Sequence, residues 1–305
     1  MLSYRAYGLN ISSEIAFPEL PEADGPRDAV IRRGPVSDWS GDAVISYGQR
    51  FRAAGARAWI RDESIPFVAS IENGGRIDVS APEGVPAGED VRLYLLGSCA
   101  GMLLYQRGLV VLHGNTIETP GGAALFCGHI GAGKSTLTMA LLRRGYRLIA
   151  DDVCGVSFQR TPAMAVPGFP RLKLWRQTLD MFGEPADSLP PIRTGTEKFH
   201  YPVANFCPEA RPLRFVYVLN PAGSQVALDE VAGARRLAVL TEHLYKVRFR
   251  DAARNWPGLA QKVMRLADEV RVVTVSRPPQ GNSVDELASR VEHDFKGLGA
   301  ASPGS

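Results

Sequence analysis

The 305-residue chain has few cysteines and no block of like charge. The cysteines are scattered, with no C-x-x-C pair, at Cys99, Cys127, Cys154 and Cys207. This pattern argues against a disulfide framework or a zinc site and suits a reducing compartment. The N-terminus has no apolar segment of the kind that directs secretion. We therefore expect a cytoplasmic protein.

The sequence also lacks the features of nucleic-acid-binding and membrane proteins. Its 35 basic and 32 acidic residues give a net charge of +3, and no basic stretch resembles a nucleic-acid footprint. Residues 93–112 alone approach the length of a membrane span, but Gln106, Arg107 and several glycines interrupt them. We expect no nucleic acid and no membrane among its partners, and a buried helix leading into a strand at 93–112.

The first 85 residues carry turn residues at short intervals and show no long helical periodicity. Strands are predicted over residues 3–9, 29–33, 57–61, 66–71 and 76–80. The last two flank Asn73-Gly74-Gly75, a hairpin signal, because Asn and Gly tolerate positive φ. Residues 1–85 are therefore predicted to form a small β-rich N-terminal domain.

Residues 86–296 alternate between helical and strand patterns, which predicts a second domain of the α/β class. Helices are predicted over 89–106, from 136 onward, over 234–245 and 257–268, and from Ser283, where Glu286 completes a capping box. Strands are predicted over 109–112, 115–118, 123–127, 147–150, 153–158, 213–219 and 270–275. Residues 159–212, rich in Pro and Gly, are expected to be largely irregular, and 297–305 to be a disordered tail.

One stretch fits G-x-x-x-x-G-K-[ST], the phosphate-binding P-loop. Its residues are Gly128, His129, Ile130, Gly131, Ala132, Gly133, Lys134, Ser135 and Thr136. An apolar run precedes it and a helical pattern follows, as the motif requires. Glycines let backbone amides surround a polyphosphate, and the helix start adds free N–H groups. Lys134 would reach the outer phosphates of ATP, and the Ser135 hydroxyl would bind Mg²⁺.

Two adjacent carboxylates, Asp151 and Asp152, end the next predicted strand. If that strand lies beside the P-loop strand, both side chains would be close to the bound phosphates. One aspartate could bind Mg²⁺ while the other accepts a proton from an incoming hydroxyl. An Asx turn with surface charge is the alternative, but a P-loop requires acidic metal ligands, which favours function.

Three blocks together resemble the catalytic domain of HPr serine kinase/phosphorylase. They are residues 112–114 (Leu-His-Gly), the P-loop, and residues 144–152, which end in the aspartate pair. The resemblance implies a P-loop fold of the HPr-kinase-like (PEP-carboxykinase-like) type. It also implies that Asp151 is the acid/base for a seryl hydroxyl, that Asp152 and Ser135 serve the metal, and that His113 lies against the catalytic aspartate. From the residues alone, His113 could equally be a core histidine.

The chain also departs from that family. Thr136 occupies the position that is acidic in the bifunctional enzymes, and the later glycine-rich loop tied to phosphorolysis has no counterpart here. The resemblance covers roughly residues 109–158. In layout the chain looks closer to lasso-peptide precursor kinases, through residues 4–9 (Tyr-Arg-Ala-Tyr-Gly-Leu) and 167–175 (Pro-Gly-Phe-Pro-Arg-Leu-Lys-Leu-Trp). Those kinases phosphorylate a serine hydroxyl at a peptide terminus.

Three basic residues in the irregular region, Arg171, Lys173 and Lys198, could contact the phosphoryl group or the acceptor. A solvated surface charge is the alternative for each. We predict a Mg-ATP-dependent kinase of a serine in a peptide or small protein, and a homo-oligomer is compatible with this reading. A small-metabolite kinase on the same fold and a non-catalytic nucleotide-binding regulatory module are the competing hypotheses.

Overall fold

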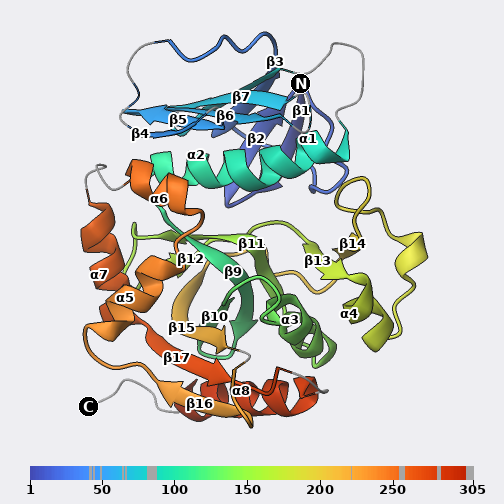
Figure 1. The fold of residues 1–305 in the computed structure, drawn as a ribbon, viewed down its shortest axis with the longest axis vertical. Helices are drawn as coiled ribbons and strands as arrows, with labels where there is room; N and C mark the ends of the chain where they lie inside the picture. Colours follow the sequence, from blue (N-terminus) through green and yellow to red (C-terminus); the bar gives the residue numbers. More distant parts are fainter. Residues whose placement is uncertain are drawn as a thin grey trace.

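The computed structural model describes residues 1–40, 43, 45–48, 50–63, 65, 67–80, 88–220, 222–253, 258–279 and 283–299. Two large sheets, a two-stranded ribbon and the helices around them make up a mixed α/β structure, which confirms that part of the predicted fold class (Figure 1). The predicted boundary at residues 85/86 lies outside the described residues, as do Pro66, Pro257 and the tail from residue 300.

The N-terminal sheet has eight strands in the order β1-β2-β3-β8-β7-β6-β5-β4. Their bounds are β1 Leu2–Ala6, β2 Leu9–Ser13, β3 Ala29–Arg33, β4 Ile45–Tyr47, β5 Phe51–Ala54, β6 Arg57–Asp62, β7 Phe67–Glu72 and β8 Arg76–Ser80. The single strand predicted over residues 3–9 is instead a hairpin, because the chain turns at Tyr7 and Gly8, whose φ angles are 55° and 71°. β2, β4 and β5 were not predicted.

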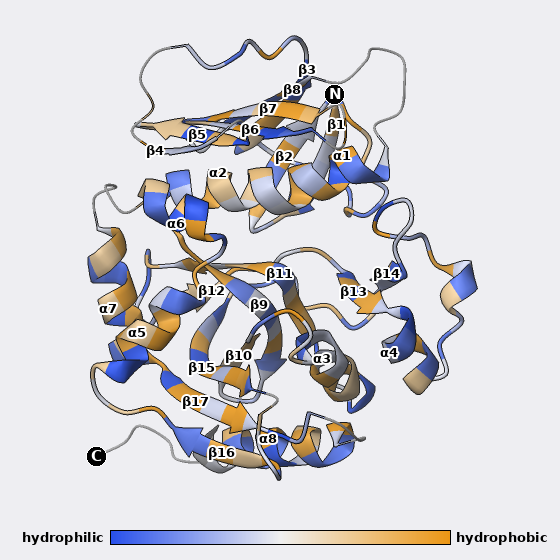
Figure 2. Cartoon of the chain, viewed as in Figure 1, coloured by the Kyte–Doolittle hydropathy of each residue, from blue (hydrophilic) through white to orange (hydrophobic). Residues whose placement is uncertain are grey.

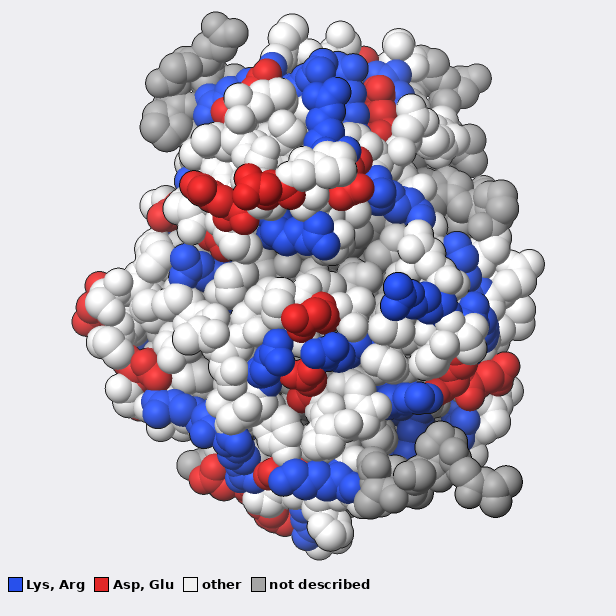
Figure 3. Space-filling model, turned by 180° about the vertical axis from the view of Figure 1, so that it is seen from behind, with Lys and Arg blue, Asp and Glu red and all other residues white. Residues whose placement is uncertain are grey.

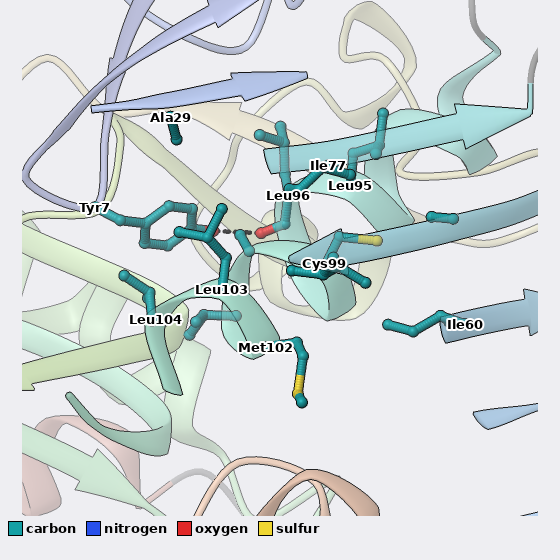
Figure 4. Packing of buried hydrophobic residues seen from close by; sticks show 14 of the residues in the cluster. Tyr7, Ala29, Ile60, Ile77, Leu95, Leu96, Cys99, Met102, Leu103 and Leu104 are labelled. Carbon is teal, nitrogen blue, oxygen red and sulfur yellow. Dashed lines mark hydrogen bonds between the residues drawn. The ribbon is translucent and has the colours of Figure 1, made fainter. Parts of the chain in front are cut away.

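A continuous helical segment lies under this sheet. It comprises α1 (Glu89–Tyr94), a π-helical turn (Leu95–Cys99) and α2 (Ala100–Gln106), where one helix over 89–106 is predicted. Its buried residues pack against the inner face of the sheet in one hydrophobic core. Figure 4 shows this packing, including the hydrogen bond that the Tyr7 hydroxyl donates to the Leu96 carbonyl of the π turn. The helix thereby connects the N-terminal sheet to the rest of the molecule.

The second sheet has the order β10-β9-β11-β12-β15-β17-β16. Its strands are β9 Val110–Thr119, β10 Gly122–Cys127, β11 Leu148–Ser157, β12 Met164–Ala165, β15 Arg211–Asn220, β16 Ala227–Glu230 and β17 Arg271–Ser276. β10 also pairs with β15, so five of the strands close into a ring of neighbours. β10, β15 and β17 run parallel, so their carboxyl ends meet at one edge.

Two strand predictions are wrong in the same way. Residues 109–112 and 115–118 were expected as separate strands, yet β9 is continuous; β11 likewise continues through Asp151 and Asp152 instead of ending there. The strand β9 stays continuous because it is hydrogen-bonded on both edges, to β10 and to β11. The strand β11 stays continuous because its pairing with β9 extends through Asp151 and Asp152. The paired backbone overrides the local turn signal of a His-Gly or Asp-Asp dipeptide.

Helices cover the second sheet (Figure 1). They are α3 Lys134–Arg143, α5 Arg235–Glu242, α7 Leu259–Glu269 and α8 Val284–Gly299. The helix α6 (Val247–Ala253) instead packs against α2 and the strands β4 and β5 of the N-terminal sheet. α3 packs against α8 over an apolar core. Figure 2 shows hydrophobic residues along the strands and on α2, with hydrophilic residues on the outer helix faces. No helix among the described residues is long and apolar enough to cross a membrane.

The stretch from 159 to 212 is more ordered than predicted. It contains a ribbon of β13 (Arg171–Trp175) and β14 (Lys198–Pro202), the helix α4 (Arg176–Met181) and a 3₁₀ turn at Ala186–Ser188. Leu172 and Leu174 of β13 are buried with Phe199 of β14 in a small core beside α3. The alternation within each strand is too short to stand out among prolines and glycines. At the other end of the chain, α8 continues past the predicted domain end at residue 296.

Candidate functional site

The glycine-rich loop lies between a buried strand and a helix. All six residues of β10 are buried, and α3 begins at Lys134 directly after the loop. Gly128, Gly131 and Gly133 have φ angles of 140°, 84° and 99°, a region that residues with a side chain rarely adopt. A Cβ at Gly128 would lie 2.8 Å from the Leu219 carbonyl oxygen. The glycines are therefore required by the path of the backbone.

The Lys134 side chain folds back over this loop. Its Nζ donates to the carbonyls of Gly128 (2.7 Å) and His129 (3.1 Å), and partial burial lowers the pKa of the ammonium. Thr136 faces α4, where its hydroxyl lies 3.1 Å from the Thr178 hydroxyl. His129 and Ile130 at the loop tip are exposed, Ile130 by 90%. The loop therefore presents backbone and Lys134, with its variable side chains turned to solvent.

The two aspartates lie level with the loop but not on the adjacent strand. β9 separates β11 from β10, so the expected adjacency is wrong. Asp152 pairs in register with Gly114, and Gly114 pairs with Cys127, the last residue before the loop. A Cβ at Gly114 would collide with the Phe126 carbonyl oxygen. Through Gly114 of β9, the register therefore places Asp152 level with the start of the loop.

Asp152 is held as an anion by two partners. Its Oδ2 lies 2.8 Å from Lys173 Nζ, and its Oδ1 lies 3.2 Å from His113 Nδ1. Burial alone would raise the pKa of Asp152, but the Lys173 charge and the His113 contact hold it well below the ordinary value. The backbone of Asp152 has φ 68°, a strained angle for a residue with a side chain.

The pKa of Asp151, one residue away, is shifted in the opposite direction. Asp151 Oδ2 accepts a hydrogen bond from the Lys173 backbone N–H (3.1 Å). Burial raises the pKa of Asp151 above its ordinary value. The positive charge of Lys173 opposes this rise, and the negative charge of Asp152 adds to it. The pair therefore contains one carboxylate that stays ionised and one that binds a proton more readily. His113 contacts Asp152, whereas the family resemblance implied contact with Asp151.

The three basic residues of the β13–β14 ribbon occupy different places. Lys173 is buried, with 8% of its surface exposed, and ion-pairs with Asp152, so it is no solvated surface charge. Lys198 Nζ lies 5.6 Å from the centre of the Trp175 ring. The positive charge of Lys198 acts to lower the pKa of both Lys134 and Asp151. Arg171 points away from the aspartates, and its Nη2 donates to the Pro18 carbonyl (3.3 Å).

Sequence reasoning missed two residues near this centre. Lys246 Nζ donates to Ser98 Oγ (2.6 Å), and burial lowers the pKa of this lysine to about 8. Among described residues with a side chain, only Tyr7, Asn73, Asp152 and Lys246 have positive φ, and all but Asn73 lie around the aspartates. Strain of this kind collects at functional sites. No sequence pattern marks Lys246.

Arg277 is the other missed residue, and for this one a signal existed. It follows β17 directly, at the sheet edge that also carries the glycine-rich loop. Its Nη2 donates to the Ala132 carbonyl (3.1 Å) and would lie 3.2 Å from a Cβ at Gly133. A basic residue after an apolar strand parallel to the P-loop strand is a candidate phosphate ligand. Elsewhere, Lys and Arg side chains are interspersed with Asp and Glu, as on the face in Figure 3.

No family model matches the chain. The chain is 28% identical to HPr kinase/phosphorylase from Azoarcus sp. (strain BH72) in a match 178 residues long, which covers 49% of this chain and 56% of that protein. The match thus spans little more than half of that relative. Among solved structures, the Hpr(Ser) kinase/phosphatase from Coxiella burnetii matches 62% of this chain and 93% of its own, with 13% identity and a TM-score of 0.29. The sequence match confirms the resemblance to HPr kinase/phosphorylase.

Proposed function

We propose that this protein is a Mg-ATP-dependent kinase that transfers the γ-phosphoryl group to a serine hydroxyl of a peptide, of the lasso-precursor type, or of a small protein. The observation that carries the proposal is the aspartate pair level with the glycine-rich loop. One carboxylate is held ionised by Lys173 and His113, and the other has a raised pKa. Environments that shift the pKa values of two neighbouring carboxylates in opposite directions are typical of acid/base sites.

The residues of the glycine-rich loop and those around it fit a nucleoside triphosphate and its metal ion. Gly128, Gly131 and Gly133 put no side chain between the loop backbone and a phosphate, and no side-chain hydrogen bond caps the start of α3, whose first amides could therefore donate to a phosphate. Lys134 and Arg277 are the cations next to the loop. Ser135 and Asp152 are the oxygen ligands that would hold Mg²⁺, which would neutralise charge on the phosphates. Within the described residues, no three His, Cys, Asp or Glu side chains form a metal site by themselves.

Asp151 is the group suited to accept the proton. As the serine oxygen forms its bond to the γ-phosphorus, the bond from that phosphorus to the β–γ bridging oxygen breaks and ADP leaves. The hydroxyl proton passes to the Asp151 carboxylate, whose raised pKa makes it a better base than an ordinary aspartate. Lys173 and Lys198 are cations whose charges act on Asp151, and they would stabilise negative charge on the transferring group, with Asp152 keeping Lys173 in place.

The proposal is tested by replacing Asp151 with asparagine. Asp151→Asn keeps the size and the hydrogen bond from the Lys173 amide but cannot take up a proton, so ATP should still bind while transfer falls by 10²–10⁴-fold, roughly the contribution of a general base. Asp180→Asn, an exposed aspartate on α4, is the matched control and should transfer normally. Transfer is measured by intact-mass spectrometry with Mg-ATP and three acceptors: HPr, a peptide with a C-terminal serine, and a metabolite pool.

The outcomes separate the competing functions. Wild-type activity in Asp151→Asn would refute the role of Asp151. Transfer to metabolites alone would favour a small-metabolite kinase. Bound ATP without transfer to any acceptor would favour a regulatory nucleotide-binding module.

A further inference from the structure

The tip of the β1–β2 hairpin lies against residues 166–170, which connect β12 to β13 and which we call the 166–170 connection. Tyr7 at this tip donates from its backbone N–H to the Gly168 carbonyl at 3.3 Å. Its ring meets the Phe169 ring edge-on, with the ring centres 5.8 Å apart. The Tyr7 hydroxyl donates to the Leu96 carbonyl of the π turn (Figure 4). Tyr7 therefore joins the connection to the helical segment under the N-terminal sheet.

The connection is held at two further places. Arg171, the residue that follows it, donates from Nη2 to the Pro18 carbonyl at 3.3 Å, a second contact with the N-terminal part of the chain. On the other side, the Gly168 N–H donates to the Ile149 carbonyl of β11 at 2.7 Å. A Cβ at Gly168 would lie only 3.3 Å from Ala150 Cα, so the connection lies tightly on β11. It is thus fixed between the N-terminal part of the chain and the two residues that precede the aspartates.

The strand that follows the connection contacts both aspartates through one residue. The Lys173 backbone N–H donates to Asp151 Oδ2 at 3.1 Å, and Lys173 Nζ lies 2.8 Å from Asp152 Oδ2. Lys173 is only two residues beyond Arg171, so a shift of the connection moves its amide as well. Hydrogen bonds weaken steeply as their geometry departs from linear. The position of the connection therefore sets how both carboxylates are held.

Backbone strain occurs at both ends of this series of contacts. Tyr7 has a φ angle of 55°, which an aromatic residue rarely adopts, and Asp152 has a φ angle of 68°. Such conformations cost free energy and persist only where the surrounding contacts impose them. At Tyr7 those contacts are the hydroxyl bond to Leu96 and the ring contact with Phe169. Strain at both ends indicates that the contacts between them are retained for position, at a cost in stability.

We infer that Tyr7 and Arg171 are positioning residues for the aspartate pair. Through the 166–170 connection they fix Lys173, and Lys173 in turn orients Asp151 toward the serine hydroxyl. The consequence for phosphoryl transfer rests on the proposed function, whereas the consequence for the position of Lys173 does not. The N-terminal sheet is thereby a working part of the site.

The first test compares two tyrosines of the same hairpin. Tyr4 is buried like Tyr7, and its ring meets Phe17 edge-on at the same 5.8 Å, so Tyr4→Leu is a matched control for Tyr7→Leu. Hydrogen exchange of the Gly168 and Lys173 amides is measured by NMR in the full-length protein without nucleotide. Relative to the amides of β10, which report general stability, exchange should be about tenfold faster in Tyr7→Leu, as the loss of one aromatic contact implies. It should be unchanged in Tyr4→Leu.

A milder variant and a kinetic measurement complete the test. Arg171→Met keeps the apolar stem but removes the bond to Pro18, and should also speed exchange at Lys173. With an acceptor that wild type phosphorylates, kcat should fall about tenfold in Tyr7→Leu, because a small displacement of the base slows transfer. KM for ATP should be unchanged, since β10 and α3 hold the glycine-rich loop. A merely structural role would affect Tyr4→Leu and Tyr7→Leu alike.

The outcomes separate the inference from the proposed function. Unchanged exchange at Lys173 in both Tyr7→Leu and Arg171→Met would overturn the inference, and so would faster exchange with an unaltered kcat. If wild type phosphorylates no acceptor, the kinase proposal fails, while the exchange rates still decide whether Tyr7 and Arg171 fix Lys173.

Discussion

The buried histidine of the β13–β14 ribbon should make the protein sensitive to mild acid. Burial of His200, together with the positive charges of Lys173, Arg171, Arg92 and Lys198, lowers its pKa from 6.5 to about 3. The unfolded chain has no such environment and takes up a proton on this histidine near pH 6.5. Between the two values the unfolded state binds more protons, so the free energy of unfolding falls as the pH falls.

The size of the effect follows from the two pKa values. At about pH 5 the unfolded histidine is almost fully protonated and the folded one is not. This difference corresponds to about 1.5 pH units, or about 2 kcal/mol of lost stability. The loss is negligible near neutral pH and continues to grow until the pH reaches about 3. About 2 kcal/mol is a measurable share of the stability of an ordinary domain.

His200→Gln removes the titration while keeping a polar side chain of similar size. Urea unfolding, followed by circular dichroism at about pH 7 and about pH 5, should show a loss on acidification that is about 2 kcal/mol smaller in the variant than in wild type. His293→Gln, which replaces an exposed histidine on α8, is the control and should behave as wild type. The same acid loss in His200→Gln and wild type would refute the reasoning.

Two further variants test the packing around the aspartates. Gly114→Ala drives a methyl group into the Phe126 carbonyl between two strands and should lower the free energy of unfolding, measured in urea, by about 3 kcal/mol. Gly34→Ala, with open space around it, is the control and should leave the free energy of unfolding nearly unchanged. Equal effects of the two variants would contradict the crowding at Gly114. Lys173→Met leaves Asp152 without its main partner and should cost about 2–4 kcal/mol at neutral pH, part of which returns as the pH is lowered and the carboxylate protonates. Lys296→Met, at an exposed ion pair on α8, should cost well under 1 kcal/mol, and a Lys173→Met variant as stable as that control would contradict the buried pairing.

The proposed machinery mixes residues that a pattern reveals with residues that it does not. Lys134 and Ser135 are fixed by a motif whose spacing has a direct physical reason. Lys173 was only one of three basic candidates, and its burial against Asp152 distinguishes it from Arg171. The direction of each aspartate's pKa shift also depends on this contact, since Asp-Asp is symmetrical in sequence.

The sequence by itself determined the local features: the mixed α/β class, the buried strand and helix on either side of the glycine-rich loop, and the helix over residues 89–106. These depend on periodicity and on glycine conformations, which act over a few residues. Only the tertiary structure decided that β9 lies between the loop strand and the aspartate strand, and that β13 and β14 form a ribbon. It also brought the hairpin tip at Tyr7 to Gly168, beside the aspartate strand. Such pairings join segments that are tens of residues apart, and short-range patterns carry no information about which distant partner a strand or side chain will meet.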